Sequence, residues 1–318
     1  MSKWKNTWIG LLALVGLGIG LPNAIASKAL SASGVGQEGV DSKGLGSAEP
    51  GTWTVFSYPS GGVAREGRLY RGRRHGEWKS YYFDGTLAYQ GSYLNYKQEG
   101  AWVFFNKDGS KREQGRFSEG LRQGEWIEFF PSGEKMSVSQ WKDGAQQGIR
   151  RHFAVAGHVS MEYTYLDGLR VGPAKQFNPT GKLQASGNYV RNGKQGLWTY
   201  YRATGTRKSF GNFDKGLESG LWYFLYPEGE VEAQGPYVNG AQDGAWIGFH
   251  PDGKTRFEGP FKAGEPNGFW VHYGTNGLRK SCGQMKAGKR NGFWTEYDGF
   301  GRTDDQASGH YDDGRKTE

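Results

Sequence analysis

Hydrophobic and polar positions follow a period of 24 residues from Gly51 onward. Each unit opens with a glycine, and in most units a tryptophan stands two residues later and a large apolar residue three residues after that. The period glycines after Gly51, which opens a slightly longer first unit, are Gly76, Gly100, Gly124, Gly148, Gly172, Gly196, Gly220, Gly244, Gly268 and Gly292. The tryptophans are Trp53, Trp78, Trp102, Trp126, Trp198, Trp222, Trp246, Trp270 and Trp294, and the apolar residues are Phe56, Tyr81, Phe105, Phe129, Tyr201, Leu225, Phe249, Tyr273 and Tyr297. A fixed period of this length indicates a tandem repeat.

Turn signals divide each unit into two short strands. A dipeptide such as Asp84-Gly85 or Asn276-Gly277 recurs at one place in the period, and dipeptides of this kind between aromatic-rich segments are strong hairpin signals. A Gly-x-aromatic element such as Gly91-Ser92-Tyr93 marks the second strand, and a further glycine closes the unit. One unit therefore predicts one β-hairpin.

Single hairpins are only marginally stable in water, so the units must stack on one another. The predicted fold is all-β: an elongated, single twisted antiparallel sheet of about 10–11 hairpins over residues 51–301. Trp78 and Tyr81 should point to opposite faces of a regular strand. Either both faces are packed or a bulge intervenes.

The unit GLWYFLYPEGEVEAQGPYVNGAQD, residues 220–243, resembles the bacterial variant of the MORN repeat, the kind found in YwqK-like proteins described as antitoxins. The resemblance covers residues 51 to about 301 and rests on the glycine, tryptophan and Gly-x-aromatic positions in register. It implies the hairpin sheet, and a use as a scaffold or membrane-associated interaction surface. The antitoxin role transfers poorly, because an antitoxin ordinarily acts in the cytoplasm and this chain begins like an exported protein.

Residues 137–179 depart from the pattern. Arg150 and Ala174 replace the tryptophan in two consecutive units, while Ser139 and Tyr163 replace the glycine of the Gly-x-aromatic element. A bend or docking patch is one interpretation, and drift in a tolerant repeat is the favoured one.

The N-terminus is typical of an export signal. Lys3 and Lys5 precede an apolar run over residues 8–21, and Ala24-Ile25-Ala26 supplies a small-x-small cleavage site. We expect cleavage after Ala26 and a periplasmic or cell-surface protein; an uncleaved anchor is the alternative, although the run is short for a membrane span. Residues 27–50 are rich in Gly, Ser and Ala and predict a flexible spacer. Residues 302–318 predict a polar, acidic C-terminal cap or tail, with Asp304, Asp305, Asp312 and Asp313 as a solvated cluster in preference to a cation site.

No constellation of residues predicts catalysis, a cofactor or a metal. The histidines, His75, His152, His158, His250, His272 and His310, are scattered over different units. Nucleophile-elbow, zinc-protease, phosphate-loop and dinucleotide motifs are absent from the sequence. Cys282 is the single cysteine, which we expect to be buried, with a disulfide-linked dimer as the alternative.

Net charge is modest, at +8, and does not suggest nucleic-acid binding. The dense basic run lies near residues 65–79, where Arg65, Arg68, Arg71, Arg73 and Arg74 are candidate contacts to an anionic surface. We therefore expect a non-catalytic interaction or scaffolding element of the cell envelope that binds another envelope protein. The alternative is a module for cell-wall glycan or anionic lipid, which would use exposed aromatic rings or this basic run.

Overall fold

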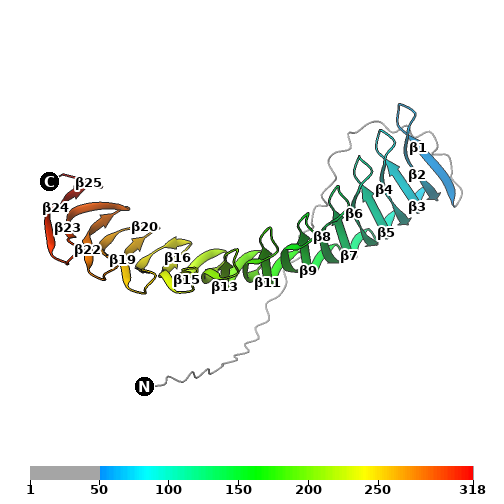
Figure 1. Cartoon of the computed structure of the whole chain (residues 1–318). Coiled ribbons are helices and arrows are strands. Elements are labelled where there is room, and N and C mark those ends of the chain that lie inside the picture. The colour runs from blue at the N-terminus through cyan, green and yellow to red at the C-terminus, as the bar shows by residue number, and fades with distance from the viewer. Residues whose placement is uncertain (1–50, 318) are drawn as a thin grey trace, which may run out of the picture. The chain divides into compact units, whose positions relative to one another are not determined.

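The computed structural model describes residues 51–317, and in this part the protein is all β (Figure 1). Its strands form one antiparallel sheet of 25 strands, which confirms the predicted fold class. The predicted signal peptide, residues 1–26, and the predicted spacer, residues 27–50, lie outside the described residues. Within residues 51–317 no helix has the length and apolar character needed to cross a membrane.

Two sets of strands alternate along the chain. The first strands of the hairpins are β1 (Thr52–Ser57), β3 (Arg73–Tyr81), β5 (Lys97–Phe105), β7 (Leu121–Phe129), β9 (Ala145–Phe153), β11 (Leu169–Phe177), β13 (Gly193–Tyr201), β15 (Leu217–Leu225), β18 (Gly244–Phe249), β21 (Gly268–Tyr273) and β23 (Lys289–Tyr297). The second strands are β2 (Val63–Tyr70), β4 (Leu87–Leu94), β6 (Lys111–Ser118), β8 (Lys135–Lys142), β10 (Val159–Leu166), β12 (Leu183–Val190), β14 (Arg207–Asp214), β16 (Val231–Val238), β19 (Thr255–Lys262), β22 (Arg279–Lys286) and β24 (Thr303–Asp312). Short strands of two residues are β17 (Ala241–Gln242), β20 (Glu265–Pro266) and β25 (Arg315–Lys316).

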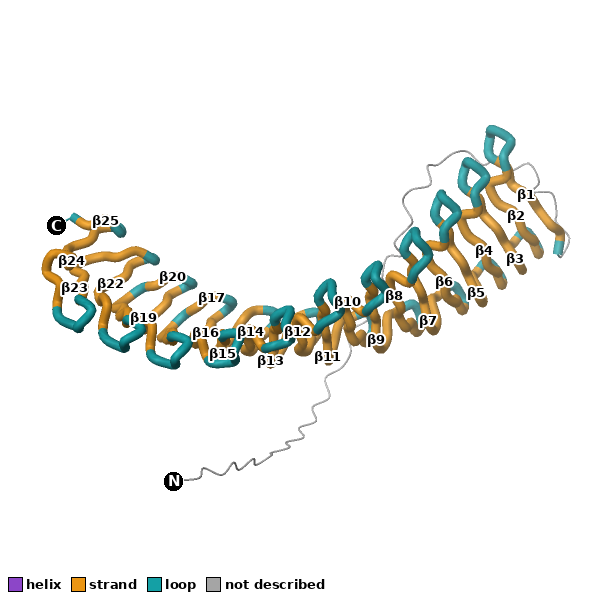
Figure 2. The backbone as a smooth tube through the Cα atoms, in the orientation of Figure 1, coloured by secondary structure: helices purple, strands orange, loops and turns teal. Residues whose placement is uncertain are grey.

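Each strand pairs with its neighbours in the chain, so the hairpins follow one another along the sheet in sequence order. The five-residue loops lie on the upper edge at the N-terminal end of Figure 2 and on the lower edge at the C-terminal end. The sheet therefore twists along its length, as expected from the right-handed twist of its strands.

The two edges of the sheet carry different turns. One edge has two-residue turns such as Glu119-Gly120, in which both residues have positive φ, the geometry that suits the twist of a hairpin. The other edge has five-residue loops such as 82–86, closed by hydrogen bonds from the Tyr82 N–H to the Thr86 carbonyl and from the Gly85 N–H to the Tyr82 carbonyl. Thus Asp84-Gly85 ends a longer loop, and the tight turns are those that close each unit.

The period glycine forms a bulge in the first strand. Gly76 has a φ of +66°, which a glycine adopts without the strain that a Cβ would bring. Across β2 and β3, Trp78 pairs with Gly67 and His75 with Arg68, so Gly76 and Glu77 are left without partners on β2. This bulge changes the direction of β3 and interrupts its pairing with β2 beside Trp78.

Trp78 and Tyr81 lie on opposite faces, because β3 is regular between them: the register shift between Ser80 and Tyr81 leaves out a residue of β4, Ala88. Both faces therefore carry aromatic side chains. We call the face with Trp78 and its equivalents the front face and the other the back face. The second residue after the tryptophan, Phe104 after Trp102 for example, shares the front face.

Proline splits two of the first strands. Pro236 and Pro260 lack the N–H that the ladder uses, and opposite them β17 is separated from β18 and β20 from β21. The Asp243 N–H donates to the Pro236 carbonyl and the Asn267 N–H to the Pro260 carbonyl. The sheet is continuous across both interruptions.

Candidate interaction surfaces

Eight tryptophans form a buried spine along the front face. These spine tryptophans are Trp78, Trp102, Trp126, Trp198, Trp222, Trp246, Trp270 and Trp294, each at most 5% exposed. Each ring lies on a glycine of the preceding strand: a Cβ built on Gly187 would meet Cδ2 of Trp198 at 2.3 Å, and the other seven pairs are equally close. The glycine of the Gly-x-aromatic element therefore leaves free the space that the indole ring occupies.

Each spine indole also donates a hydrogen bond to the backbone. Nε1 of Trp198 donates to the Asn188 carbonyl at 3.0 Å, and the other seven indoles make the same bond to the residue after their glycine. In two units the same carbonyl also accepts a backbone N–H: Asp243 donates to Pro236 and Asn267 to Pro260. The glycine, the bulge and the tryptophan thus act together, and the polar Nε1–H of the buried indole has a hydrogen-bond acceptor.

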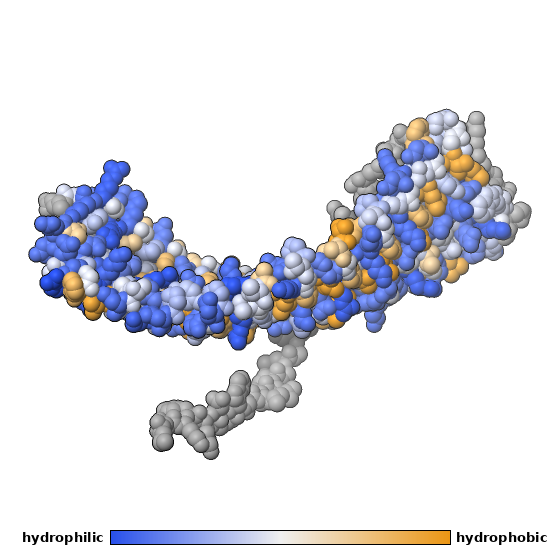
Figure 3. Space-filling view, viewed as in Figure 1, coloured by the Kyte–Doolittle hydropathy of each residue, from blue (hydrophilic) through white to orange (hydrophobic). Residues whose placement is uncertain are grey.

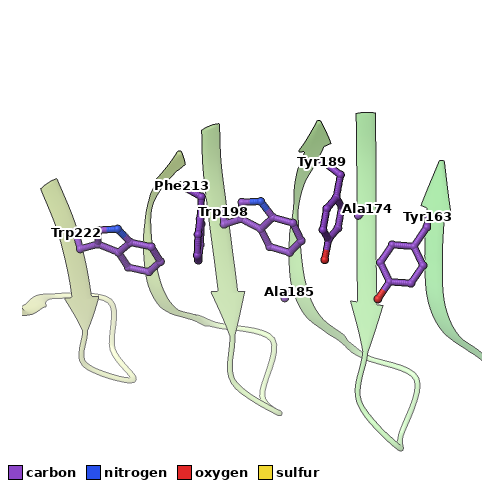
Figure 4. Packing of buried hydrophobic residues seen from close by; sticks show 7 residues of the cluster. All are labelled: Tyr163, Ala174, Ala185, Tyr189, Trp198, Phe213 and Trp222. Atoms are coloured by element: carbon purple, nitrogen blue, oxygen red, sulfur yellow. The ribbon is translucent and has the colours of Figure 1, made fainter. Parts of the chain in front are cut away.

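Further rings and cations cover the spine. Phe213 meets Trp222 edge-on with centroids 5.3 Å apart, and Tyr200 of the preceding unit lies 6.2 Å from the same indole. Figure 4 shows this row of side chains crossing successive strands. Above Trp198, Nζ of Lys194 lies 4.5 Å from the ring centroid and donates to the Tyr200 hydroxyl. Burial, with Glu218 nearby, raises the pKa of Tyr200 to about 12.

Trp53 does not belong to the spine. The first hairpin is one residue longer, so Trp53 pairs with Arg68 and Thr54 takes the place opposite Gly67. The Trp53 side chain is 48% exposed. The sequence pattern grouped it with the other tryptophans, and the pairing register corrects this assignment. Phe56 packs against Trp78 instead, at 6.1 Å between centroids.

An aromatic cage built from the repeat tryptophans is excluded by the buried spine, because a ring without solvent access cannot stack on a ligand. Exposed rings in the described residues lie elsewhere, at Trp53, Phe83, Tyr96, Phe269, Phe293 and Phe300. The glycan interpretation is left with these exposed rings and the basic run.

The units between Glu128 and Gln176 interrupt the spine without interrupting the sheet. Arg150 stands where a tryptophan would lie and donates to the Glu128 carboxylate at 2.9 Å and to Oγ of Ser137, which is fully buried. Trp141 donates to Oγ of Ser139, the residue in the glycine position. An ion pair with hydroxyl partners thus replaces the ring on its glycine.

The next unit exchanges large and small residues across the same pair. Tyr163 occupies the glycine position and Ala174 the tryptophan position; the two are cross-strand partners and both are buried. The Tyr163 ring packs edge-on against Tyr189 at 5.8 Å, which rejoins the spine. Because β7 to β12 remain paired throughout, residues 137–179 are structured as hairpins like their neighbours.

The five candidate arginines do not form one patch. Arg74 lies on the front face, donates to the Tyr93 hydroxyl at 2.9 Å and lies 5.1 Å from the Trp78 centroid. Arg65 lies over the Phe56 ring, and burial together with Arg74 lowers its pKa. Arg68 reaches the Gly51 carbonyl from the opposite face. Only Arg71 and Arg73, at a tight turn, are exposed without such a backbone or front-face role.

The back face carries an exposed apolar row that the sequence reading missed. It consists of the residues directly after the period glycines: Ile149, Pro173, Leu197, Leu221, Ala245, Phe269 and Phe293. Leu197 is 55% exposed, Phe269 and Phe293 are both 52%, and Leu221 is 44%. In the N-terminal units the same positions hold Glu77, Ala101 and Glu125. Reading the column after the glycine would have found this row.

The remaining candidate groups are dispersed. Within residues 51–317 no three His, Cys, Asp or Glu side chains come together as a metal site. Asp304 accepts hydrogen bonds from the N–H groups of Gln306 and Ala307, and Asp313 pairs with Lys289 at 2.8 Å. Cys282 is a free, buried thiol on the back face, 3.6 Å from the Tyr297 hydroxyl.

The family comparison agrees with this repeat geometry. Four segments match the MORN repeat variant. They are residues 74–95, 170–191, 218–239 and 242–263, and each covers one hairpin from its first strand to the tight turn. The segment 170–191 includes Pro173 and Ala174, so a MORN-type hairpin is matched even where the tryptophan is missing.

Solved structures add little. A GtfA/B complex bound to UDP and GlcNAc is 14% identical over 35% of this chain and 22% of its own, with a TM-score of 0.17. A Photorhabdus luminescens Tc holotoxin pore is 13% identical over 78% of this chain and 15% of its own, with a TM-score of 0.17. A TcdB2-TccC3-Cdc42 structure is 10% identical over 77% of this chain and 14% of its own, with a TM-score of 0.18. The chain thus spans less than a quarter of each of these structures. No curated protein matches the chain.

Proposed function

We propose that this chain is a non-catalytic interaction or scaffolding element of the cell envelope, exported by a signal peptide cleaved after Ala26. Its hairpins are of the bacterial kind found in YwqK-like proteins. The observation that carries the proposal is the back face, where successive units present an exposed apolar side chain at the same position. Contiguous exposed apolar surface of this kind marks interaction sites.

The difference between the packed front face and the exposed back face supports a binding role. The front-face rings hold the sheet together, the eight spine indoles donate to backbone carbonyls, and the Tyr200 hydroxyl accepts from Lys194. Figure 3 shows that apolar surface in that view gathers over the N-terminal half, whereas the C-terminal end is mostly polar. Different parts of the array therefore offer chemically different surfaces.

Capture from solubilised envelope tests this function. The processed protein is immobilised and the retained proteins are identified, with a variant carrying Ile149→Asp and Leu197→Asp as the matched control. A specific envelope protein that is retained by the wild type and lost from the control supports the proposal. Export is tested separately by N-terminal sequencing, since an intact Met1 in the envelope fraction would contradict cleavage after Ala26.

A contact with anionic lipid or cell-wall polymer is the second candidate, favoured by the exposed Arg71 and Arg73. Exposed arginines near a charged surface each contribute about 1 kcal/mol and are screened by salt. Binding to anionic vesicles that falls with salt, and that is lost in Arg71→Gln with Arg73→Gln, would place this function first. Arg74 is left unchanged because it packs on the spine.

A further inference from the structure

We propose that the back face between Leu197 and Phe293 is a self-association surface, on which a second copy of this chain packs face to face. This surface, called the back patch here, comprises the exposed row Leu197, Leu221, Ala245, Phe269 and Phe293 together with the neighbouring row Thr199, Tyr223, Ile247, Val271 and Thr295. The inference concerns the partner of one surface and is independent of where the protein acts.

The back patch is nearly free of charge. The residues paired across it from the second strands are Phe210, Asn212, Gln234, Pro236, Glu258, Pro260, Cys282, Gln284 and His310. Glu258 is the one ionisable carboxylate among them, and it accepts a hydrogen bond from the Tyr273 hydroxyl at 2.6 Å. Beside the patch, the Arg207 guanidinium lies 5.9 Å from the centroid of the Phe210 ring. The equivalent N-terminal rows carry Glu77, Lys79, Arg116 and Glu125. The absence of charge is thus a property of the C-terminal units.

The two faces of the sheet differ in how they are covered. On the front face the rings lie flat on glycines and shield one another, so Trp198 is 0% exposed. On the back patch the row from Leu197 to Phe293 is exposed, whereas the neighbouring row is half-buried at Tyr223 and Ile247 and buried at Val271. Phe210 stacks on Tyr223 there at 4.8 Å between centroids. A sheet with an uncovered apolar face is ordinarily covered by a second layer. Within residues 51–317 every strand belongs to the one sheet, which offers no second layer.

A second copy fits this surface by size and by charge. With strands about 4.8 Å apart, the patch is about 40 Å long, and its two rows with their side chains are about 15 Å high. Each copy would then cover about 600 Å², and the pair about 1,200 Å², the lower end of the range for specific interfaces. Two identical faces with so few charged side chains meet with little like-charge repulsion, whereas the charged N-terminal rows would repel one another.

A symmetric pair predicts one close contact in particular. Two identical patches that overlap fully must be related by a two-fold axis through their middle. The middle of the exposed row is Ala245, two units from Leu197 on one side and two from Phe293 on the other. Ala245 of one copy should therefore lie near Ala245 of the other.

Analytical ultracentrifugation of the processed protein tests the association. We expect the mass of two chains, and a rise of at least about tenfold in the dissociation constant for Leu221→Asp with Phe269→Asp, since each buries a charge at the centre of the interface. Leu217→Asp is the matched control: Leu217 lies on the same strand and is 49% exposed, but at the tight-turn edge. It should leave the dissociation constant unchanged. Protection of the indoles from a quencher shows that each variant is folded.

Disulfide trapping tests the position of the two-fold axis near Ala245. In a Cys282→Ser background, Ala245→Cys should give a cross-linked dimer under mild oxidation, whereas Ala101→Cys, at the same place in an N-terminal unit and also exposed, should remain monomeric. A wild-type mass of one chain at concentrations of about 100 µM would overturn the proposal. So would a dimer that survives the two aspartates, or equal cross-linking at the two cysteines.

Discussion

The regular units and the units between Glu128 and Gln176 hold the same sheet together by different chemistry. In the regular units an indole lies on a glycine, as Trp198 lies on Gly187. In the middle units both positions of the pair have changed, to Arg150 with Ser139 in one unit and to Ala174 with Tyr163 in the next. The backbone register survives both changes. The repeat therefore requires a filled space between two neighbouring strands, and the tryptophan is one way of filling it.

The largest expected effect comes from changing one member of a regular pair. Trp198→Ala removes a buried ring and should cost about 3–5 kcal/mol. Gly187→Tyr should be at least as damaging, because its Cβ alone would meet the indole at 2.3 Å. The double variant reproduces the arrangement of Tyr163 and Ala174. Thermal unfolding of all three should give a favourable coupling of at least about 2 kcal/mol; additive losses would show that the pair is not a shared space.

Breaking the ion pair between Arg150 and Glu128 should have an intermediate effect on the free energy of unfolding. Arg150→Met leaves the Glu128 carboxylate, whose side chain is 27% exposed, without its cation, at a cost of about 1–2 kcal/mol. Adding Glu128→Phe places a ring at the position that Phe104 and Phe224 hold in regular units, and should restore most of the loss. If Glu128→Phe instead deepens the loss, the middle units are not interchangeable with the others.

Local opening should be easier in the middle units. Ring contacts between units are few there, since the edge-on contacts end at Phe117 with Trp126 and resume at Tyr163 with Tyr189. Amides of β9 and β10 should exchange about tenfold faster than those of β13 and β14, which corresponds to about 1.4 kcal/mol. The comparison is made by hydrogen exchange on one sample. Uniform exchange would mean that the ion pair and the ring are equivalent in strength.

The smallest expected effect is a loss of stability in mild acid. Burial, and then nearby Arg290, lower the pKa of His272, whose ring stacks between Trp270 and Trp294. As the pH falls below the ordinary histidine pKa of about 6.5, the unfolded chain takes up the proton more readily, so stability present above that pH is lost below it. His272→Phe should flatten the fall between pH 7 and 5 in thermal unfolding, whereas His310→Phe, at an exposed ring, should not.

The fold was predictable from sequence because the residues that build each hairpin recur periodically. Glycine, tryptophan and turn positions recur every 24 residues, and the structure gives each glycine a physical role. Gly76 lies in a bulge, Gly187 lies beneath an indole ring and Gly120 lies in a tight turn. Trp53 was grouped with the other repeat tryptophans, but a single extra residue in the first hairpin places Thr54 instead of Trp53 opposite the glycine.

The interaction surfaces were harder to predict. A run of arginines in sequence looked like one patch, but strand alternation and the tight turn send Arg65 and Arg74 to the front face and Arg68 to the back. The back row was visible as a column after the period glycine, yet its meaning depended on knowing that the tryptophans are buried. Exposure depends on how neighbouring hairpins cover one another, and periodicity alone does not give it.

Quenching of tryptophan fluorescence tests most directly whether the front face is a closed spine. A variant with Trp4, Trp8 and Trp53 replaced by Phe retains the eight spine tryptophans and Trp141. The account predicts that iodide leaves nearly all of its emission intact until the protein is unfolded, and that restoring Trp53 adds a quenchable fraction. Strong quenching of the folded variant would mean that the indoles are open to solvent, and would return the front face to consideration as a ligand surface.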